Sequence, residues 1–450
     1  MESGLFVGLD VGTTSLKAVA VDASGRLVGE SSAPTPWRHR GAESDCDPLE
    51  LAAVARSVLS AVVDDPRFPV AARILGVGVT GMAESGVLLD ARGRVLAPAL
   101  AWHDPRGEVE VIEQSIGSDA FHRHVGMRLN SKPSVAKILW LQRHVPEAAG
   151  AVRHLCIAEW IVHSLGGAQV AELSLTSRTG LFDVVEKRPW QATLELAGNL
   201  LSDRLVIAGD DCGRVDADLP AAYAGAVLTV CGMDHMSAAF AAGAAVSGAL
   251  YDSMGTAEAF LRFEPAHLTR DQFATLVAED LAILWSVVPD HVCVLGATLT
   301  GLSLERVHRL LGLRDRAERR AVAEAALAVS REGSDIVVDG SSHTGLQVRG
   351  IADDASPALL WRAAVEDLLA HSFAQLEFME QVVGPRHSAV IGGGWINDPM
   401  VAEVKRIQLG EYRVTDVAEA GAVGAAMFAA IAAGAMPRPS VDDPPRWPST

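Results

Sequence analysis

The sequence has few cysteines, no long apolar run and no excess of positive charge, and each absence excludes a class of protein. The cysteines stand singly, without the paired spacing of a zinc site or a disulfide framework, so we expect reduced thiols; they are Cys46, Cys156, Cys212, Cys231 and Cys293. Apolar stretches are broken by charge or glycine before they reach membrane-spanning length, and no basic segment followed by an apolar one opens the chain. We therefore expect a cytoplasmic protein with no signal peptide and no membrane partner.

Positive charge is scarce, because 38 Lys and Arg stand against 56 Asp and Glu and give a formal net charge of −18. Such a surface repels phosphates, which excludes a general nucleic-acid surface. The Walker lysine motif and a strand-linked GxGxxG are both missing, so neither a P-loop nor a dinucleotide-binding fold is predicted. A nucleotide would have to be held by local N–H groups and a metal ion.

The length and composition indicate a compact protein of two domains. The chain has 450 residues, of which 49% are hydrophobic and 21% are charged. This length exceeds one ordinary hydrophobic core. The predicted division is residues 1–244, residues 245–436 and a Pro-rich tail, 437–450.

The segment 5–25 joins a predicted buried strand to a turn that could hold phosphate. Two short apolar runs, 5–9 and 16–21, predict neighbouring strands, and the link between them carries Gly12, Thr13, Thr14 and Ser15. A glycine turn with hydroxyls and free N–H groups can surround an anion. A plain hairpin would explain the same residues.

Asp10 is a carboxylate beside this anion site. A carboxylate repels phosphate unless a cation lies between them, so the pair suggests Mg²⁺ bridging Asp10 to a nucleotide, directly or through water.

A second buried strand, 74–81, leads to Glu84, and a later segment leads to Trp102 and Asp104. Carboxylates beside an aromatic face suit a neutral polyhydroxy ligand, whose hydroxyls need acceptors and whose C–H face needs an apolar platform. Surface charge with a core tryptophan is the alternative interpretation.

The segment 227–235 predicts a strand that ends at Gly232 and presents Asp234 to a cleft, followed by a small-residue helix. Asp234 is suited to accept a proton from an alcohol. Its alternative role is a helix N-cap. His235 ranks second as a base, since a neighbouring histidine is more often a hydrogen-bonded partner.

The second half repeats the opening pattern, with a strand that leads to the turn Gly255-Thr256. A second turn of this kind could meet the first across a cleft and close on phosphates. The run 388–394 is an apolar strand that breaks into glycines, where a planar base could lie against the backbone. Residues 276–284 are predicted as a helix and 296–301 as a flexible link.

In their order and spacing these motifs resemble the FGGY family of carbohydrate kinases, within the actin-like, sugar kinase and heat-shock ATPase superfamily. The matching segments are the first phosphate motif at 9–15, a signature segment at 137–144, the base-carrying segment at 232–234, the second phosphate motif at 255–256, the adenosine motif at 392–394 and the closing helix at 419–426.

The resemblance implies an α/β fold of two ribonuclease-H-like lobes (actin/hexokinase-type) with an interlobe cleft, and ATP-dependent phosphorylation of a sugar or polyol. It implies Asp234 as the catalytic base and Mg²⁺ near Asp10 and Asp234. The nucleotide residues that follow are Gly12, Thr13, Thr14, Ser15, Gly255, Thr256, Gly301, Gly393, Gly394 and Asn397.

The substrate pocket departs from the family patterns. Residues 82–84 read Met-Ala-Glu, where xylulose kinases have Gln-Met-His and glycerol kinases have Arg-Glu. We expect a small ketose or polyol, held by Glu84, Trp102, Asp104 and Glu159 together with Asp234. The alternative is a catalytically silent ATP- or sugar-binding protein of the same fold. The oligomeric state stays open, with a homodimer as the candidate.

Overall fold

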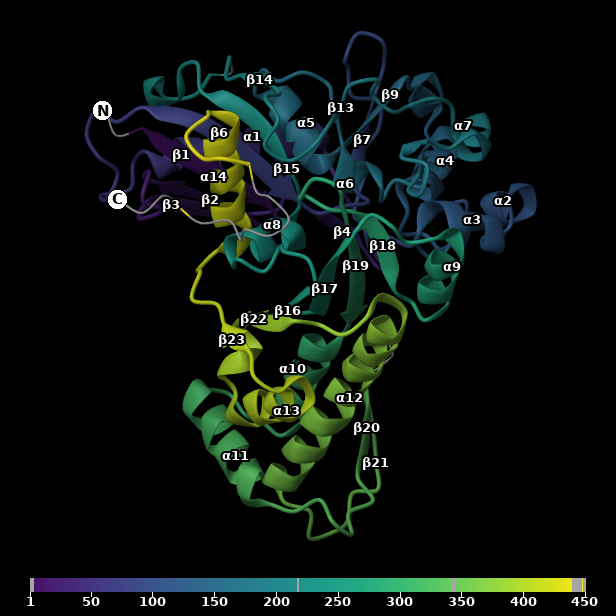
Figure 1. Cartoon of the computed structure of the whole chain (residues 1–450), viewed down its shortest axis with the longest axis vertical. Helices are drawn as coiled ribbons and strands as arrows, with labels where there is room; N and C mark the ends of the chain where they lie inside the picture. The colour runs from purple at the N-terminus through teal and green to yellow at the C-terminus, as the bar shows by residue number, and fades with distance from the viewer. Residues whose placement is uncertain (1–3, 217, 341–344, 439–446, 448–450) are drawn as a thin grey trace.

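The chain folds into two lobes, each built on one six-stranded sheet, in a computed structural model that describes residues 4–216, 218–340, 345–438 and 447 (Figure 1). The first sheet has the order β14-β15-β6-β1-β2-β3. Its strands are β1 (Leu5–Val11), β2 (Ser15–Val21), β3 (Leu27–Pro34), β6 (Ile74–Gly81), β14 (Gly213–Arg214) and β15 (Val227–Met233). The strand β1 is antiparallel to β2 and parallel to β6, which is parallel to β15.

The second sheet has the order β18-β19-β17-β16-β22-β23. Its strands are β16 (Ala249–Met254), β17 (Glu258–Pro265), β18 (Ala282–Trp285), β19 (His291–Thr298), β22 (Ser388–Gly392) and β23 (Arg413–Val414). Here β16 is antiparallel to β17 and parallel to β22, so five strands of each sheet share one topology. The predicted α/β fold of two similar lobes is confirmed.

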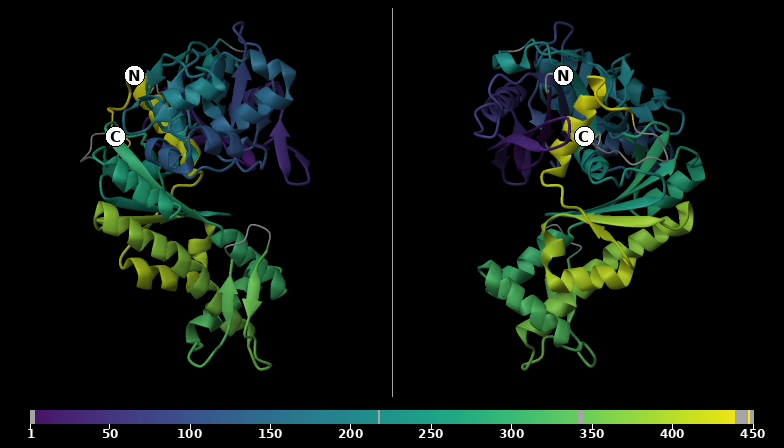
Figure 2. Two further views of the ribbon diagram at one scale, coloured as in Figure 1. Left: turned by 90° about the vertical axis from the view of Figure 1, so that its right-hand side faces the viewer. Right: turned by 60° about the vertical axis from the view of Figure 1, so that its left-hand side comes forward.

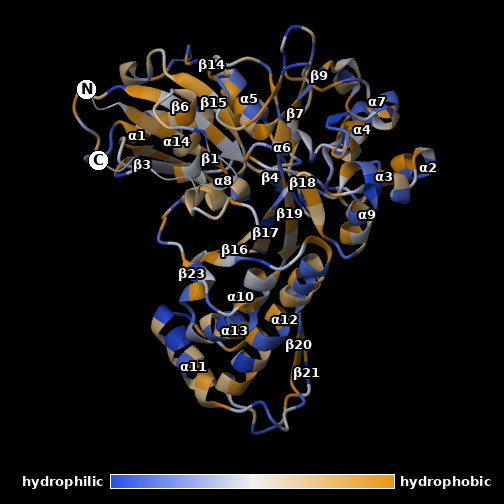
Figure 3. Ribbon diagram, viewed as in Figure 1, coloured by the Kyte–Doolittle hydropathy of each residue, from blue (hydrophilic) through white to orange (hydrophobic). Residues whose placement is uncertain are grey.

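Helices cover both sheets. Those of the first half are α1 (Pro48–Val62), α2 (Val109–Ser115), α3 (Ser118–Val125), α4 (Ser134–His144), α5 (Ile157–Ser164), α6 (Leu173–Thr176), α7 (Gln191–Ala197) and α8 (Asp234–Ala241). Those of the second half are α9 (Arg270–Ala278), α10 (Thr300–Leu310), α11 (Arg316–Ala328), α12 (Pro357–Val383), α13 (Pro399–Leu409) and α14 (Ala420–Ala432). Figure 3 shows hydrophobic residues concentrated along the strands of the first sheet, whereas α11 mixes both kinds.

Short strands complete the first lobe and its insertions. They are β4 (Arg38–Arg40), β5 (Glu43–Cys46), β7 (Gly86–Leu89), β8 (Ala99–Leu100), β9 (Arg153–Cys156), β10 (Ala171–Glu172), β11 (Phe182–Asp183), β12 (Arg188–Pro189) and β13 (Leu205–Val206). The pair β20 (Val337–Asp339) and β21 (Gln347–Arg349) extends the second lobe. Three 3₁₀ turns lie at Pro146–Gly150, Ala221–Tyr223 and Gly394–Asn397.

The last helix, α14, returns to the first lobe and packs on β1 and β6 (Figures 1 and 2). Small residues allow this close approach, because a Cβ at Gly8 would lie 1.8 Å from the Ala422 carbonyl oxygen and one at Gly78 would lie 2.0 Å from that of Ala425. Packing therefore assigns α14 to the first lobe, although we predicted residues 245–436 as the second. The rest of the division stays a prediction.

Two local predictions are wrong. The predicted helix 276–284 ends at Ala278, and β18 begins at Ala282, because Asp280 takes a left-handed backbone with φ +63° that ends the helix. The predicted flexible link 296–301 instead finishes β19 and begins α10. Strand pairing with β17 holds residues up to Thr298 in the sheet.

All five cysteines are free thiols, as predicted, and all five are buried. Of the Pro-rich tail the structure describes residues 437, 438 and 447, and the Trp447 ring lies 6.2 Å from that of Phe6. Within the described part of the chain, no helix is long and apolar enough to cross a membrane.

Candidate active site

Three parallel strands of the first sheet end at one edge and bring the predicted catalytic residues there. In the register of the sheet Asp10 on β1 pairs with Thr80 on β6, and Gly81 pairs with Met233 on β15. The next residue after β15, Asp234, begins α8. Segments that are far apart in the sequence are therefore brought together at this edge.

Asp10 and Asp234 influence each other at this edge. The Oδ1 atom of Asp10 is sealed from solvent and has no hydrogen-bond partner among the described residues. Gly421 of α14 packs against the same carboxylate, since a Cβ there would lie 2.4 Å from Asp10 Oδ2. Burial and then the negative charge of Asp234 raise the pKa of Asp10 to about 8. Asp10 is thus a buried carboxyl group whose ionisation the nearby positive charges of His235 and Lys17 support only in part.

Asp234 is held by its neighbour. Its Oδ1 accepts hydrogen bonds from the His235 backbone N–H and from His235 Nδ1, both at 2.7 Å, and its side chain is 20% exposed. Burial opposes ionisation of Asp234, but the His235 charge and hydrogen bonds outweigh it and hold the pKa below its usual value. Burial likewise opposes protonation of His235, but Asp234, Asp10 and Glu84 raise its pKa. Asp234 is therefore a charged acceptor whose Oδ2 remains for a ligand.

The predicted phosphate turn is braced by two tryptophans. Trp37 Nε1 donates to the Thr13 carbonyl oxygen at 2.7 Å, and Trp102 Nε1 donates to Thr13 Oγ1 at 2.9 Å. The Thr13 hydroxyl therefore keeps its own proton for a ligand. The Gly12 N–H donates to the Ser15 carbonyl at 3.1 Å and closes the turn, and Thr14 is exposed at its tip.

Glu84 forms a buried ion pair that the sequence does not reveal. It is 6% exposed, its φ is +61°, and its Oε1 accepts from Arg178 Nε at 2.7 Å. Arg178 is itself 7% exposed and follows α6, almost a hundred residues away in the chain. Strained backbone of this kind is often found at functional sites. Arg178 places a guanidinium beside Glu84 that residues 82–83 do not supply.

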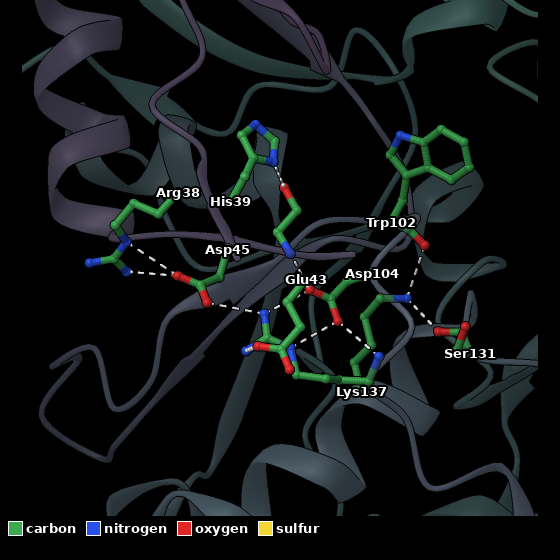
Figure 4. A network of polar contacts seen from close by, with 10 residues as sticks. Arg38, His39, Glu43, Asp45, Trp102, Asp104, Ser131 and Lys137 are labelled. Atoms are coloured by element: carbon green, nitrogen blue, oxygen red, sulfur yellow. Dashed lines mark hydrogen bonds and ion pairs between the residues drawn. The ribbon is translucent and has the colours of Figure 1, made fainter. Parts of the chain in front are cut away.

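Asp104 links the segments around Trp102 through hydrogen bonds (Figure 4). It is fully buried, and its oxygens accept from the Ser44 N–H at 2.7 Å, the Arg106 N–H at 2.8 Å and the Arg106 guanidinium. Burial opposes ionisation of Asp104, yet the Arg106 hydrogen bonds keep its pKa below the usual value. Its acceptors are already used, so its assignment to the substrate stays a prediction without support from this geometry.

Lys137 fixes the backbone of Trp102 in the same network (Figure 4). It is 3% exposed, and its Nζ donates to the carbonyl oxygens of Trp102 at 3.1 Å, Ser131 at 2.5 Å and Lys132 at 2.7 Å. Trp102 is thus anchored both through its backbone and through its indole.

Glu159 lies in the interior rather than at the strand-end edge. It is 2% exposed and caps α5, because its Oε2 accepts from the Cys156 N–H at 2.7 Å while Oε1 accepts from the Glu172 N–H at 2.6 Å. Burial raises the pKa of Glu159 to about 8. The structure does not bring it together with Asp234 as a free acceptor.

The second sheet presents the predicted nucleotide segments at its own edge. β16 and β22 run in parallel, and the turn after β16 carries Gly255 and Thr256. A Cβ at Gly393 would lie 2.3 Å from the Met254 carbonyl oxygen, and one at Gly301 would lie 1.9 Å from that of Gly255. The three segments therefore touch, and only glycine permits these approaches.

Beside them lies a cavity of about 390 Å³. Three predicted residues, Gly255, Gly394 and Asn397, line it. Sequence reasoning missed the other wall residues, which are Met254, Glu305, His308, Arg316, Arg319, Arg320, Trp395, Asp398 and Pro399. The available signal was the helical spacing of Gly301, Glu305 and His308, which places them on one face of α10.

A buried ionic cluster lies under the second turn. Lys405 Nζ of α13 lies 2.6 Å from Asp252 Oδ2 on β16 and 2.5 Å from Glu258 Oε1 on β17. Burial, opposed by Lys405, raises the pKa of Asp252 to about 6. Because Asp252 and Glu258 flank Gly255-Thr256, Lys405 ties the two arms of this turn to α13, whose N-cap is Asp398.

Comparison with known proteins identifies the family. The model of the N-terminal domain of the FGGY family of carbohydrate kinases matches residues 5–241, more than half of the chain. The chain belongs to the FGGY family of carbohydrate kinases. The resemblance seen in the sequence motifs is thereby confirmed.

Relatives of this FGGY-family chain match almost its whole length. It is 26% identical to an L-fuculokinase of Salmonella typhi, covering 95% of this chain and 92% of that protein. It is 27% identical to a glycerol kinase of Aromatoleum aromaticum, covering 95% and 90%. The solved xylulose kinase of Rhodospirillum rubrum superimposes with a TM-score of 0.83 at 23% identity, covering 96% and 91%, and so shares the fold.

Proposed function

We propose that this chain is an ATP-dependent kinase that transfers the γ-phosphate to a hydroxyl of a small sugar or polyol. The observation that carries the proposal is the pair of strand-end sites. One presents the charged Asp234 carboxylate, whose Oδ2 has no hydrogen-bond partner among the described residues, and the other borders a cavity lined by Gly255, Gly394 and Asn397. Membership of a carbohydrate kinase family supports this assignment of roles.

Asp234 is the general base of the proposed reaction. Its Oδ2 takes the proton of the acceptor hydroxyl, the oxygen attacks the γ-phosphorus, and the bond to the β-phosphate oxygen breaks, leaving ADP. His235 holds Oδ1 and so fixes the direction of the carboxylate. The hydroxyl of Thr13 and the N–H groups of both turns position the phosphates.

The metal residues fit Mg²⁺. In the described ranges, no group of three or more His, Cys, Asp or Glu side chains could hold a metal ion by itself. Asp10, whose buried Oδ1 has no partner among those residues, lies close enough to Asp234 for their charges to interact. These are the hard oxygen ligands that Mg²⁺ takes together with phosphates and water. When bound, Mg²⁺ would offset negative charge on the phosphates.

The substrate we propose is neutral, either a ketose such as a pentulose or a glycerol- or tetritol-like polyol. Glu84, held by Arg178, would accept from its hydroxyls, and Trp102 would face its C–H groups. Nothing in the comparisons favours the catalytically silent alternative, since the relatives named above are kinases. A cytoplasmic location and a homodimer stay predictions.

An acceptor screen tests the proposal. Purified protein with Mg-ATP is incubated with a panel of ketoses and polyols, and ADP release is measured with and without each acceptor. We expect at least one acceptor to stimulate ADP release well above the background without acceptor. Absence of stimulation across the panel would refute the kinase assignment.

A further inference from the structure

The strand β15 becomes irregular just before it presents Asp234. Along this stretch three steps of β15, from Val230 to Met233, correspond to only two steps of the neighbouring β6. The extra residue makes a β-bulge, a feature that redirects the side chains around it and is common beside active sites. Gly232 lies in the bulge with a left-handed backbone, φ +72°. The bulge therefore sets the direction in which the chain delivers Asp234.

Two buried hydroxyls hold the backbone of this bulge. Thr80 of β6 donates from Oγ1 to the Gly232 carbonyl oxygen at 2.7 Å. Ser174 of α6 accepts at Oγ from the Met233 N–H at 3.3 Å. Both side chains are completely buried. A bulge disrupts the ladder of backbone hydrogen bonds, and these hydroxyls give partners to a carbonyl and an N–H inside it.

Glu172 fixes the direction of the Ser174 hydroxyl. Its Oε2 accepts from the Leu175 N–H at 3.0 Å and from Ser174 Oγ at 2.7 Å. Because Ser174 donates its one proton to Glu172, its lone pairs are left for the Met233 N–H. The hydroxyl also lies directly against the bulge, since a Cβ at Gly232 would be 2.5 Å from Ser174 Oγ. Ser174 is thus held between Glu172 and the bulge.

Glu159 extends this support into the interior of the lobe. Its Oε2 accepts from the Cys156 N–H and its Oε1 from the Glu172 N–H, so it joins the start of α5 to the segment that carries Glu172 and Ser174. Glu159 therefore lies away from the strand-end edge but is connected to the bulge through a chain of hydrogen bonds.

We propose that Ser174 and Thr80 are positioning residues for the general base, because they hold the bulge and so aim the Asp234 carboxylate at the acceptor hydroxyl. This assignment rests on the proposed function, since it takes Asp234 as the base. His235 fixes the carboxylate group itself, whereas the bulge fixes the backbone from which that side chain starts. Ser174 and Thr80 are sealed from solvent and contact no ligand, so their effect falls on turnover and not on binding.

The test compares Ser174→Ala with Ser177→Ala. Ser177 is also completely buried, and its hydroxyl donates to the Leu173 carbonyl oxygen at 2.7 Å and accepts from the Trp285 N–H at 3.2 Å. It has the hydrogen-bonding pattern of Ser174, but its N–H partner is on β18 and not on β15, which makes it the matched control. With an acceptor found in the screen, kcat is measured at saturating ATP, calorimetry gives the affinities for the acceptor and for ADP, and the unfolding temperature is recorded.

We expect both variants to unfold at a lower temperature than the wild type, because each leaves a buried N–H without its acceptor. The kcat of Ser174→Ala should fall about 10- to 100-fold, the cost of a misplaced catalytic group, while its affinities for the acceptor and ADP stay close to those of the wild type. Ser177→Ala should keep the wild-type kcat. Thr80→Val, which keeps the side-chain shape and removes the hydroxyl, should lose kcat without losing affinity.

Combination with Asp234→Asn separates a positioning role from a general structural one. If Ser174 acts through the base, Ser174→Ala should lower turnover far less in a chain that already carries Asp234→Asn than in the wild type. Turnover of these slow variants is measured with enzyme in excess over the acceptor. Equal fold losses in the two backgrounds would overturn the assignment.

A wild-type kcat in Ser174→Ala, or an equal loss of kcat in Ser177→Ala, would also overturn it, and the proposed function would stand as long as Asp234→Asn is slow. If Asp234→Asn turns over like the wild type, Asp234 is not the base, and its role and this assignment fail together. If Ser174→Ala does not fold, Thr80→Val decides the question by the same measurements.

Discussion

The two lobes share a topology but treat their strand-end carboxylates in opposite ways. In the first lobe, Asp10 leads to a Gly-Thr turn with Oδ1 unpartnered within the described residues and Asp234 nearby. In the second, Asp252 precedes a similar turn, but Lys405 neutralises it together with Glu258. In the first lobe Asp234 stays charged and available for chemistry. In the second lobe the carboxylates pair with Lys405 and hold the Gly255-Thr256 turn in place.

The largest expected effect comes from removing the charge of Asp234 in the first lobe. Asp234→Asn keeps the shape of the side chain and removes the proton acceptor, so kcat should fall about 10²- to 10⁴-fold, the usual contribution of a general base. Acceptor affinity, measured by calorimetry, should change little. A variant that turns over at the wild-type rate would move the base elsewhere, with His235 as the next candidate.

Removing the charge of Lys405 in the second lobe should lower the stability of the fold. Lys405→Met leaves Asp252 and Glu258 buried without a cation, so the free energy of unfolding should drop by about 3–5 kcal/mol in urea denaturation. The control is Lys405→Met combined with Asp252→Asn and Glu258→Gln, which removes all three charges and should regain much of the loss. If the single variant is as stable as the wild type, the cluster does not support the turn.

The stability of the protein should depend on pH partly through His308 of the second lobe. Burial lowers the pKa of His308 to about 4 in the folded protein against 6.5 for a free side chain, so the unfolded state binds more protons between these values. The contribution of His308 to stability therefore falls as the pH drops through this window, by about 2 kcal/mol between pH 7 and pH 5. The loss should be smaller in His308→Phe, as measured by urea unfolding at both pH values. Identical losses in the two proteins would argue against a neutral buried imidazole.

The smallest expected effect concerns the turn of the first lobe. Thr13→Val removes the hydroxyl that accepts from Trp102 and can donate to a phosphate, so the KM for ATP should rise several-fold, equivalent to about 1 kcal/mol. Thr13→Ser keeps the hydroxyl and should behave nearly like the wild type. Steady-state kinetics with varied ATP separates the two. Equal KM values would mean that the hydroxyl does not touch the nucleotide.

The sequence was sufficient to predict the strands and glycine turns, because local patterns of hydrophobic residues and glycine determine them. The strand that carries Asp10, the strand before Asp234 and the glycine segments around Gly255 and Gly393 all lie where hydrophobic runs and glycine predicted them. The fold follows from these strands because each lobe repeats one topology. The family motifs then identified which turns belong together.

Partners that come from distant segments could not be predicted. Arg178 reaches Glu84, and Lys405 reaches Asp252, across stretches of about a hundred residues or more that no periodicity links. For the same reason Asp104 and Glu159 were predicted as ligand acceptors. A sequence shows a carboxylate but not the N–H groups that pack against it and occupy its oxygens.

Phosphorus NMR of the reaction mixture tests the central claim, that the cleft delivers phosphate from ATP to a hydroxyl activated by Asp234. With an acceptor found in the screen, the account predicts a new phosphomonoester signal that grows in step with ADP in the wild type and is nearly absent in Asp234→Asn. Formation of inorganic phosphate without a phosphomonoester, or equal product from both proteins, would contradict it.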